Sequence, residues 1–465
     1  MAPLRKGHLL ARVNFPPYAI HNLTERHILV AGGGGDAKCG IPNTVEIYEL
    51  INNGSTCRAE PVTHYDTGSH AIMNCTVFHN GKHHVLAAGM EEMCQMYQLT
   101  YKILGEEKDG SGVKVGVKDK TPTPNNKSVR RRRRTNSFSS ENEKDIKEEE
   151  NKPKIQESTT EMGVPVVEKK RKKSDANSNS IITQVGFDVK PIQSFQTDFN
   201  KKEEPFQKVV RFTSVSNILA TAGADGHVRL WKYPELTLLH DIEAHGDEVD
   251  NIDFSPSGNK IVSISRDGHG FVWNVKDGTK HCELKFLLPK KGDDKYIFRS
   301  CRYGIVEGDK SNFKLFTIVN PAVRKKTPLP CYLFKWNATK YVVEKMVSTG
   351  TDMLSVMTVS DDGRFVGLGT LSGSVDIYIS FSLMKLYHVE NAHNIFVTGL
   401  EFLPSNEEAQ RITGDQDTSL ISISVDNHII VHHVPKPSTM GIVGILLLFM
   451  AVLFLVYVLL DYLNL

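Results

Sequence analysis

The stretch ILATAGADGHVRLW, residues 218–231, decides the fold class of this chain. It combines a strand of small and apolar residues, an Asp225–Gly226 pair and a second strand that ends on Trp231. Asp-Gly between two strands predicts a tight hairpin turn, because such a turn requires positive φ. The pattern returns as IVSISRDGHGFVW at 261–273, ending on Trp273, so the sequence has an internal repeat with a period of about 40 residues.

Three further segments follow the same pattern: HVLAAGMEEMCQMY (84–97), FVGLGTLSGSVDIY (365–378) and LISISVDNHIIVH (420–432). Strand, tight turn and strand at this period resemble the blades of WD-repeat propellers. We therefore expect an all-β, seven-bladed WD-repeat-like β-propeller, with blades at roughly 25–60, 70–103, 205–240, 245–285, 290–340, 350–388 and 395–434. The alternating segment 8–20 is expected to close the ring by completing the last blade, which removes exposed sheet edges.

Polar residues near the turns could suggest catalysis, but the resemblance to WD repeats implies a structural role. It implies that His245, Ser265, Asp267 and Trp273 form a buried hydrogen-bond relay that holds one blade. Buried polar groups require such partners. His393, Ser424 and Asp426 repeat the pattern in a later blade, with His432 in place of Trp.

Composition bounds the class of protein. The chain has 465 residues, of which 40% are apolar, so it can bury a large core and is not globally disordered. Its net charge of +2 indicates no particular partner. Its seven cysteines include no C-x-x-C pair, which argues against a zinc site or a disulfide framework and favours a reducing compartment.

A charged segment at 104–182 interrupts the repeats between the second and third predicted blades. It contains the basic runs 130–134 and 169–173, the acidic run 148–150 and almost no aromatic residues. Such composition cannot bury enough surface to fold, so we expect a disordered charged insertion. The predicted propeller then comprises 1–103, with the closing strand and blades one and two, and 183–434, with blades three to seven.

The segment GIVGILLLFMAVLFLVYVLL, residues 441–460, contains no charge. Twenty helical residues span about 30 Å, the thickness of a bilayer core, so the segment predicts a single transmembrane helix. Lys436 precedes it in the linker 435–440, and basic flanks favour the cytosol. The propeller is therefore predicted to be cytosolic and the tail 461–465 lumenal.

The stretch VAGGGGDAKCGIPNTVEIY, residues 30–48, places four glycines after a strand. Its spacing fits neither a P-loop nor a dinucleotide fingerprint, and an alternating strand rather than a helix follows. Consecutive glycines cost conformational entropy that an ordinary hairpin need not lose. We expect close approach to this backbone, or convergence of its carbonyl groups.

A propeller, a glycine-rich loop in the first blade and one C-terminal anchor together resemble the prolactin regulatory element-binding protein (PREB) family. Its members are endoplasmic-reticulum WD-repeat guanine nucleotide exchange factors for the Sar-type small GTPase. The resemblance covers essentially the whole chain, and its most specific segment is AGGGGDAKCGIPN. It implies no acid–base or covalent chemistry but a loop that contacts the GTPase and contains a potassium ion with unspecified ligands. That loop comprises Gly32, Gly33, Gly34, Gly35, Asp36, Lys38, Gly40, Ile41, Pro42 and Asn43.

By the same resemblance, the partners are the GDP-bound and nucleotide-free GTPase, the endoplasmic-reticulum membrane, and COPII coat or cargo-receptor proteins. The expected role is to start COPII vesicle coat assembly and transport from the endoplasmic reticulum to the Golgi. Two alternatives remain: a membrane-anchored scaffold for coat proteins without exchange activity, and a DNA-binding transcriptional regulator. Nucleic-acid binding is disfavoured because the basic runs include no interleaved aromatics and no recognisable DNA-binding motif.

Overall fold

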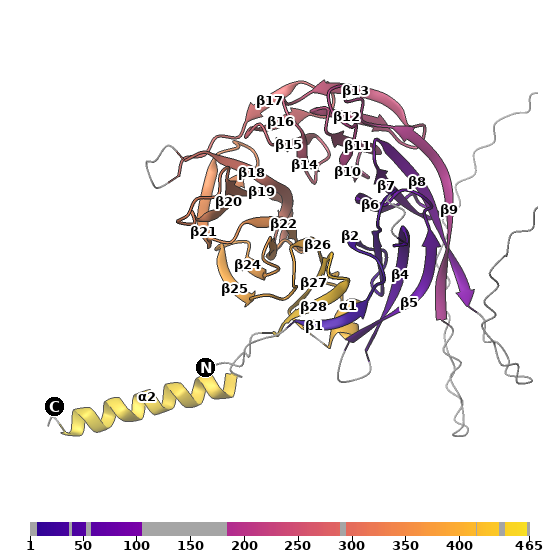
Figure 1. The fold of residues 1–465 in the computed structure, drawn as a ribbon. Coiled ribbons are helices and arrows are strands. Elements are labelled where there is room, and N and C mark those ends of the chain that lie inside the picture. The colour runs from indigo at the N-terminus through magenta and orange to yellow at the C-terminus, as the bar shows by residue number, and fades with distance from the viewer. Residues whose placement is uncertain are drawn as a thin grey trace, which may run out of the picture. The chain divides into compact units, whose positions relative to one another are not determined.

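The computed structural model describes residues 7–36, 40–52, 57–104, 184–288, 294–414, 416–436 and 442–462. Seven four-stranded antiparallel sheets form the blades of a β-propeller, and Figure 1 shows them arranged in a ring. The predicted all-β, seven-bladed fold is therefore confirmed. The disordered insertion predicted at 104–182 lies outside the described residues, except that Leu104 ends a strand of the second blade.

Each blade runs from an inner to an outer strand. The first consists of β2 (Pro17–Asn22), β3 (His27–Gly32), β4 (Thr44–Asn52) and β5 (Cys57–Asp66), and the second of β6 (Asn74–His79), β7 (His84–Met90), β8 (Met93–Leu104) and β9 (Gln184–Gln196). The third consists of β10 (Gln207–Thr213), β11 (Ile218–Gly223), β12 (His227–Lys232) and β13 (Thr237–Glu243). The fourth consists of β14 (Val249–Phe254), β15 (Lys260–Ser265), β16 (Gly270–Asn274) and β17 (Lys280–Glu283).

The remaining blades follow the same plan. The fifth consists of β18 (Tyr296–Val306), β19 (Asp309–Pro321), β20 (Cys331–Asn337) and β21 (Val343–Gly350), and the sixth of β22 (Leu354–Val359), β23 (Phe365–Thr370), β24 (Val375–Ile379) and β25 (Met384–Val389). The seventh consists of β26 (Val397–Phe402), β27 (Thr418–Ser424), β28 (His428–Val434) and β1 (His8–Arg12). The short helix α1 (Glu407–Thr413) lies between β26 and β27 in sequence.

Apolar side chains between neighbouring blades form the core. One cluster, for example, joins Leu29 and Ile47 of the first blade to Leu86 and Leu99 of the second. Neighbouring inner strands contact each other around the ring, and β2 contacts both β6 and β26. The strands fold in this way because alternate residues of each strand face an adjacent blade, where burial of apolar area stabilises the fold.

The hairpin turns have the backbone conformation that their sequences predict. Gly226 and Gly268, the glycines of the two Asp-Gly pairs, have φ values of 79° and 87°. Asn427, at the equivalent position of the seventh blade, has φ 68°. These positions require glycine or asparagine because other side chains are strained at positive φ.

The ring is closed by the N-terminal segment, as the sequence predicts, but with different bounds. Only β1 pairs with β28 and completes the seventh blade. Residues from Pro17 onward instead form β2, the inner strand of the first blade. The predicted closing strand 8–20 therefore combines two strands of different blades, because alternation alone does not reveal the break at Asn14–Pro16.

The insertion also lies at a different point of the repeat. It was predicted between the second and third blades, but it separates β8 from β9 within the second blade. These two strands pair along their lengths from Met93–Gln196 to Leu104–Gln184. The prediction that 183–434 contains only blades three to seven is therefore wrong, since β9 belongs to the second blade. The sequence concealed this because the two strands are far apart along the chain.

The predicted relay in the fourth blade exists, with one residue corrected. His245 Nδ1 lies 3.0 Å from Asp267 Oδ2, and its Nε2 lies 2.8 Å from the hydroxyl of Ser263, not of Ser265. The indole N–H of Trp273 donates to the same Ser263 oxygen at 2.9 Å. Trp273 pairs with Ile261, so its indole reaches the next residue on that face of the strand, Ser263.

Ser265 lies one pleat further, at the turn, where it donates to the carbonyl of Asp247 and accepts from the N–H of Asp267. The seventh blade needs the same correction: His393 contacts Asp426 and Ser422, not Ser424. These residues therefore form the hydrogen-bond relay that the resemblance to WD repeats implies, and Ser263 and Ser422 supply its hydroxyl groups.

The predicted membrane segment forms the helix α2 (Ile442–Tyr462). Within the described part of the chain, no helix meets the length and hydropathy needed to cross a bilayer. The single transmembrane helix therefore stays a prediction from sequence.

Candidate functional site

The glycine-rich loop connects β3 to β4 in the first blade. Pro17 of β2, Gly32 of β3, Thr44 of β4 and Asp66 of β5 lie next to one another in the strand register. All four strands therefore begin or end at one rim of the blade, and the loop rises from this rim. The inner strand β2 starts at the same rim, so the loop lies beside an entrance to the centre of the ring.

Two of the glycines are required by close backbone packing. A Cβ atom on Gly32 would lie 2.1 Å from the carbonyl oxygen of Pro16, and one on Gly33 would lie 2.2 Å from Asn43 Oδ1. Gly33 also has φ 147° and donates its N–H to the Pro16 carbonyl at 3.1 Å. No residue with a side chain fits at either position without displacing its neighbours.

Asn43 holds the two arms of the loop together. Its Oδ1 accepts from the N–H of Gly35 at 2.9 Å, and its Nδ2 donates to the carbonyls of Gly35 at 3.1 Å and Gly68 at 2.9 Å. Its own carbonyl accepts from the N–H of Thr67 at 2.9 Å. Asn43 is buried, so these bonds replace those that it would make to water. The side chain therefore braces the loop and joins it to the next turn.

The outer part of the loop is available for contact. Asp36 and Gly40 are exposed, and Ile41 exposes 42% of its surface. Pro42 is half-buried and Gly34 is partly covered. Lys38 lies outside the described residues. The predicted residues thus separate into a buried base at Gly32, Gly33 and Asn43 and an exposed tip.

Sequence reasoning missed the neighbouring segments on which the loop rests. The Pro16 carbonyl supports Gly33, and Gly68 accepts from the Asn43 brace. Asp66 fixes that second turn by accepting from the N–H of Gly68 at 2.8 Å. The Asp-Thr-Gly sequence at 66–68 is a turn signal that could have indicated this support.

The oxygens at the base of the loop have a composition that suits a hard monovalent cation. The carbonyls of Gly35 and Gly68 each accept one hydrogen bond from Asn43, and a carbonyl oxygen has two lone pairs. The hydroxyl of Thr44 is buried without a hydrogen-bond partner in the described part of the chain. That part contains no group of three or more His, Cys, Asp or Glu side chains arranged for a metal.

Comparisons with known proteins agree with this fold. A family described as "WD domain, G-beta repeat" matches residues 208–232 and 236–274, the blade with the Asp225 turn and the blade with the His245 relay. The mouse guanine nucleotide-exchange factor SEC12 is 32% identical over 98% of this chain and 98% of its own length. The chain belongs to the SEC12 family. The rat SEC12 protein matches equally well, at 32% identity over 98% of both chains.

More distant SEC12 relatives cover less of the chain. SEC12-like protein 2 of Arabidopsis thaliana is 28% identical over 47% of this chain and 51% of its own length. Among solved structures, Raptor of Chaetomium thermophilum matches with a TM-score of 0.55 at 12% identity, over 94% of this chain and 30% of its own. That similarity supports the propeller fold alone. Membership of the SEC12 family therefore rests on the full-length rodent matches.

Proposed function

We propose that this protein is a guanine nucleotide exchange factor for the Sar-type small GTPase and that the glycine loop is its exchange element. The observation that carries the proposal is the combination of full-length similarity to SEC12 exchange factors with a braced loop that exposes its tip. The buried base fixes the loop, and exposed Ile41 offers an apolar contact to a partner.

The proposed mechanism is preferential binding. A factor that binds the nucleotide-free GTPase more tightly than its GDP complex lowers the barrier to GDP loss. A rigid loop can act as a wedge beside the phosphate and magnesium contacts of the partner, because the Asn43 bonds resist its displacement. No residue of the chain needs to transfer a proton or form a covalent bond in this process.

The proposal also includes the subcellular localisation of the protein. The uncharged sequence 441–460 supports a single C-terminal anchor in the endoplasmic-reticulum membrane, with the propeller in the cytosol and the C-terminus in the lumen. Activation of the GTPase at this membrane would start COPII coat assembly and transport to the Golgi. COPII coat or cargo-receptor proteins are then further partners.

A potassium ion is proposed as part of the loop. The residues that would hold it are Gly35 and Gly68 through their carbonyls. When bound, the ion would supply positive charge that draws the carbonyls of the two turns together. The Asn43 amide also holds these two carbonyls close together, because its Nδ2 donates to both.

The function is tested by GDP release from a purified Sar-type GTPase with residues 1–435, which contain the whole closed ring. We expect saturable acceleration in potassium chloride, weaker acceleration in lithium chloride at the same ionic strength, and none with an unrelated small GTPase. Binding of the Sar-type GTPase without faster GDP release would instead indicate a scaffold. An equal rate in both salts would remove the ion from the proposal and leave the exchange activity intact.

A further inference from the structure

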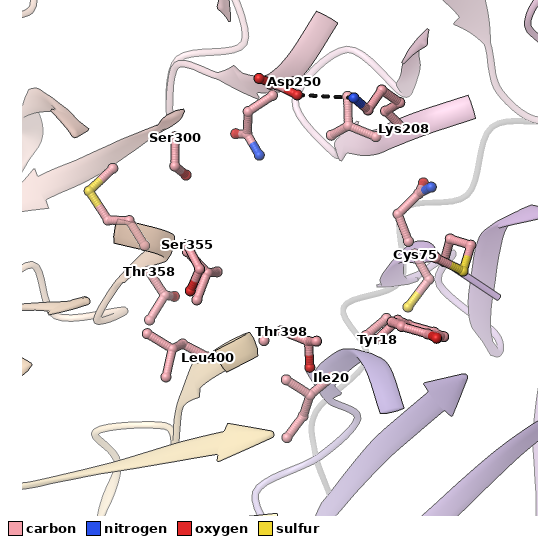
Figure 2. Close-up of a pocket in the computed structure, with 18 of the residues that line it drawn as sticks. Tyr18, Ile20, Cys75, Lys208, Asp250, Ser300, Ser355, Thr358, Thr398 and Leu400 are labelled. Carbon is pink, nitrogen blue, oxygen red and sulfur yellow. Dashed lines mark hydrogen bonds and ion pairs between the residues drawn. The ribbon is translucent and has the colours of Figure 1, made fainter. Parts of the chain in front are cut away.

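A polar cavity of about 570 Å³ occupies the centre of the ring. Its walls come from the inner strands of all seven blades, and Figure 2 shows their side chains directed into it. The size is in the range of small-molecule sites. The two sides of the cavity differ in chemistry.

One side concentrates cations around a single carboxylate. Asp250 is 4% exposed and lies 3.1 Å from Lys208 Nζ, 3.6 Å from Arg299 Nη1 and 3.8 Å from Arg266 Nε. The contact between Asp250 and Lys208 is visible in Figure 2. Glu248 also pairs with Lys208 and Arg266. Two carboxylates thus face three cations, and one positive charge is left in excess.

Two further guanidinium groups, those of Arg211 and Arg302, lie near the two carboxylates Asp253 and Glu401. Arg211 lies 3.7 Å from Asp253, while Arg302 donates to Asn251 Oδ1 and to the carbonyl of Cys301 at 2.7 Å. Burial and the neighbouring Arg302 charge lower the pKa of Arg211 to about 10, and the carboxylates of Asp253 and Glu401 act in the opposite direction. Such an arrangement is costly unless an anion offsets it.

The opposite side carries hydroxyl groups. Tyr18, Ser355, Thr358 and Thr398 line it, and Ser300 lies between the two sides in Figure 2. The Ser355 and Thr398 hydroxyls donate to the carbonyls of Val397 and Pro17. The hydroxyls of Tyr18 and Thr358 can donate hydrogen bonds to anionic oxygens, and guanidinium groups bind phosphate oxygens in pairs. One carboxylate also lines this side: Glu401, which lies 3.8 Å from His21 Nδ1.

We propose that the central cavity binds a compact, multiply phosphorylated small molecule. Its phosphates would contact Arg266, Arg299 and Arg302 on one side and the hydroxyls of Tyr18 and Thr358 on the other. The site is separate from the glycine loop, and the inference rests on the cavity rather than on the proposed exchange activity. Bound there, the ligand would link inner strands of opposite blades and stabilise the ring.

The test is calorimetric titration of the full-length protein in neutral detergent with inositol hexakisphosphate, and separately with inorganic triphosphate. We expect saturable binding of inositol hexakisphosphate that weakens as salt is raised, because charge contacts are screened. Arg266 and Arg299 are 52% and 39% exposed, so the double variant Arg266→Gln/Arg299→Gln should fold. We expect its Kd to rise at least tenfold. Tighter binding of triphosphate would favour a linear over a ring-shaped ligand within the same class.

The matched control is Arg58→Gln, which removes an exposed arginine from β5, an outer strand. Its Kd should stay within twofold of the wild-type value. Arg266→Gln alone serves if the double variant fails to fold, with an expected weakening of threefold or more. The proposal is overturned if neither phosphate compound binds saturably, or if the cavity variants bind as tightly as the Arg58→Gln control.

Discussion

Gly33 and Asn43 show how one contact can explain a rare sequence. A run of four glycines could not be interpreted from spacing alone, but the structure places the Asn43 amide where a Cβ of Gly33 would lie. The sequence indicated that something must approach this backbone closely, and the partner is a residue ten positions further along. Ser263 gives the opposite lesson. The relay pattern allowed two serines on one strand face, and only the strand register distinguishes them.

The relay residue Trp273 should contribute to stability rather than to function. Its side chain is buried between blades, and its indole N–H is bonded to Ser263. We expect Trp273→Ala to lower the free energy of unfolding by about 3–5 kcal/mol through cavity formation. Urea unfolding followed by circular dichroism measures this change. A loss below about 1 kcal/mol would show that the blade does not depend on the relay.

His432 predicts a pH dependence of stability. Burial lowers its pKa to about 3, and the charges of His393 and His433 add to the effect, whereas an unfolded histidine has a pKa of about 6.5. The unfolded chain thus takes up the proton first as pH falls. The stabilisation from neutral His432 is complete above pH ~6.5 and is lost toward the folded pKa, at up to ~1.4 kcal/mol per pH unit.

Urea unfolding of the wild type and of His432→Asn at pH 7.5 and 5.5 tests this account. The wild type should lose more stability between the two pH values than the variant, because the variant lacks the titrating ring. His245, whose pKa is also lowered by burial, lies in the fourth blade and contributes to both proteins alike. Equal losses would show that His432 does not titrate between folded and unfolded states.

At the scale of elements, the sequence repeats predict the blades. They do not predict two pairings between strands that lie far apart along the chain. Each tight hairpin was predictable from its own turn residues, such as Asp225–Gly226. The pairing of β8 with β9 was not predictable. About 80 residues separate the two strands, and no short turn between them indicates that they pair. The division of 8–20 into β1 and β2 was missed for a similar reason: the partner of β1 is the last strand of the propeller.

The insertion should be dispensable for the fold. Replacement of residues 108–178 by a short Gly/Ser bridge keeps β8 and β9 intact, and loop length affects stability only weakly. We expect the melting temperature to change by no more than about 2 °C in differential scanning calorimetry. A large decrease would mean that residues of this segment pack against the ring.

The C-terminal segment predicts topology. If 441–460 spans the membrane with the propeller in the cytosol, protease added to intact microsomes should remove the propeller. Asn337, which lies in an N-x-[ST] sequence at the end of β20, should then remain unglycosylated. Sugar on Asn337, or full protection from protease, would contradict the predicted orientation.

At the scale of the whole molecule, the closed ring supports the glycine loop on its first blade. The first blade is held between β6 and β26, and β1 joins the N-terminal segment to the last blade. The base of the loop is bonded to Pro16 and Gly68 of the same blade, which suits a part that must displace elements of a partner. Ring, loop and C-terminal segment were all visible in the sequence, whereas the charged central cavity was not, because its residues come from seven separated strands.

One measurement tests the central claim most directly: GDP release from a Sar-type GTPase with the double variant Gly33→Val/Gly34→Val, beside Asn43→Ala, Ile41→Ala and the wild type. The Gly33→Val change forbids the close approach to Asn43, and Asn43→Ala removes the brace, while the strands of the ring remain. We expect unchanged circular dichroism and GDP release slowed tenfold or more, equivalent to ~1.4 kcal/mol of lost barrier reduction. Release at the wild-type rate by these folded variants would contradict the account and reduce the glycines to a permissive turn.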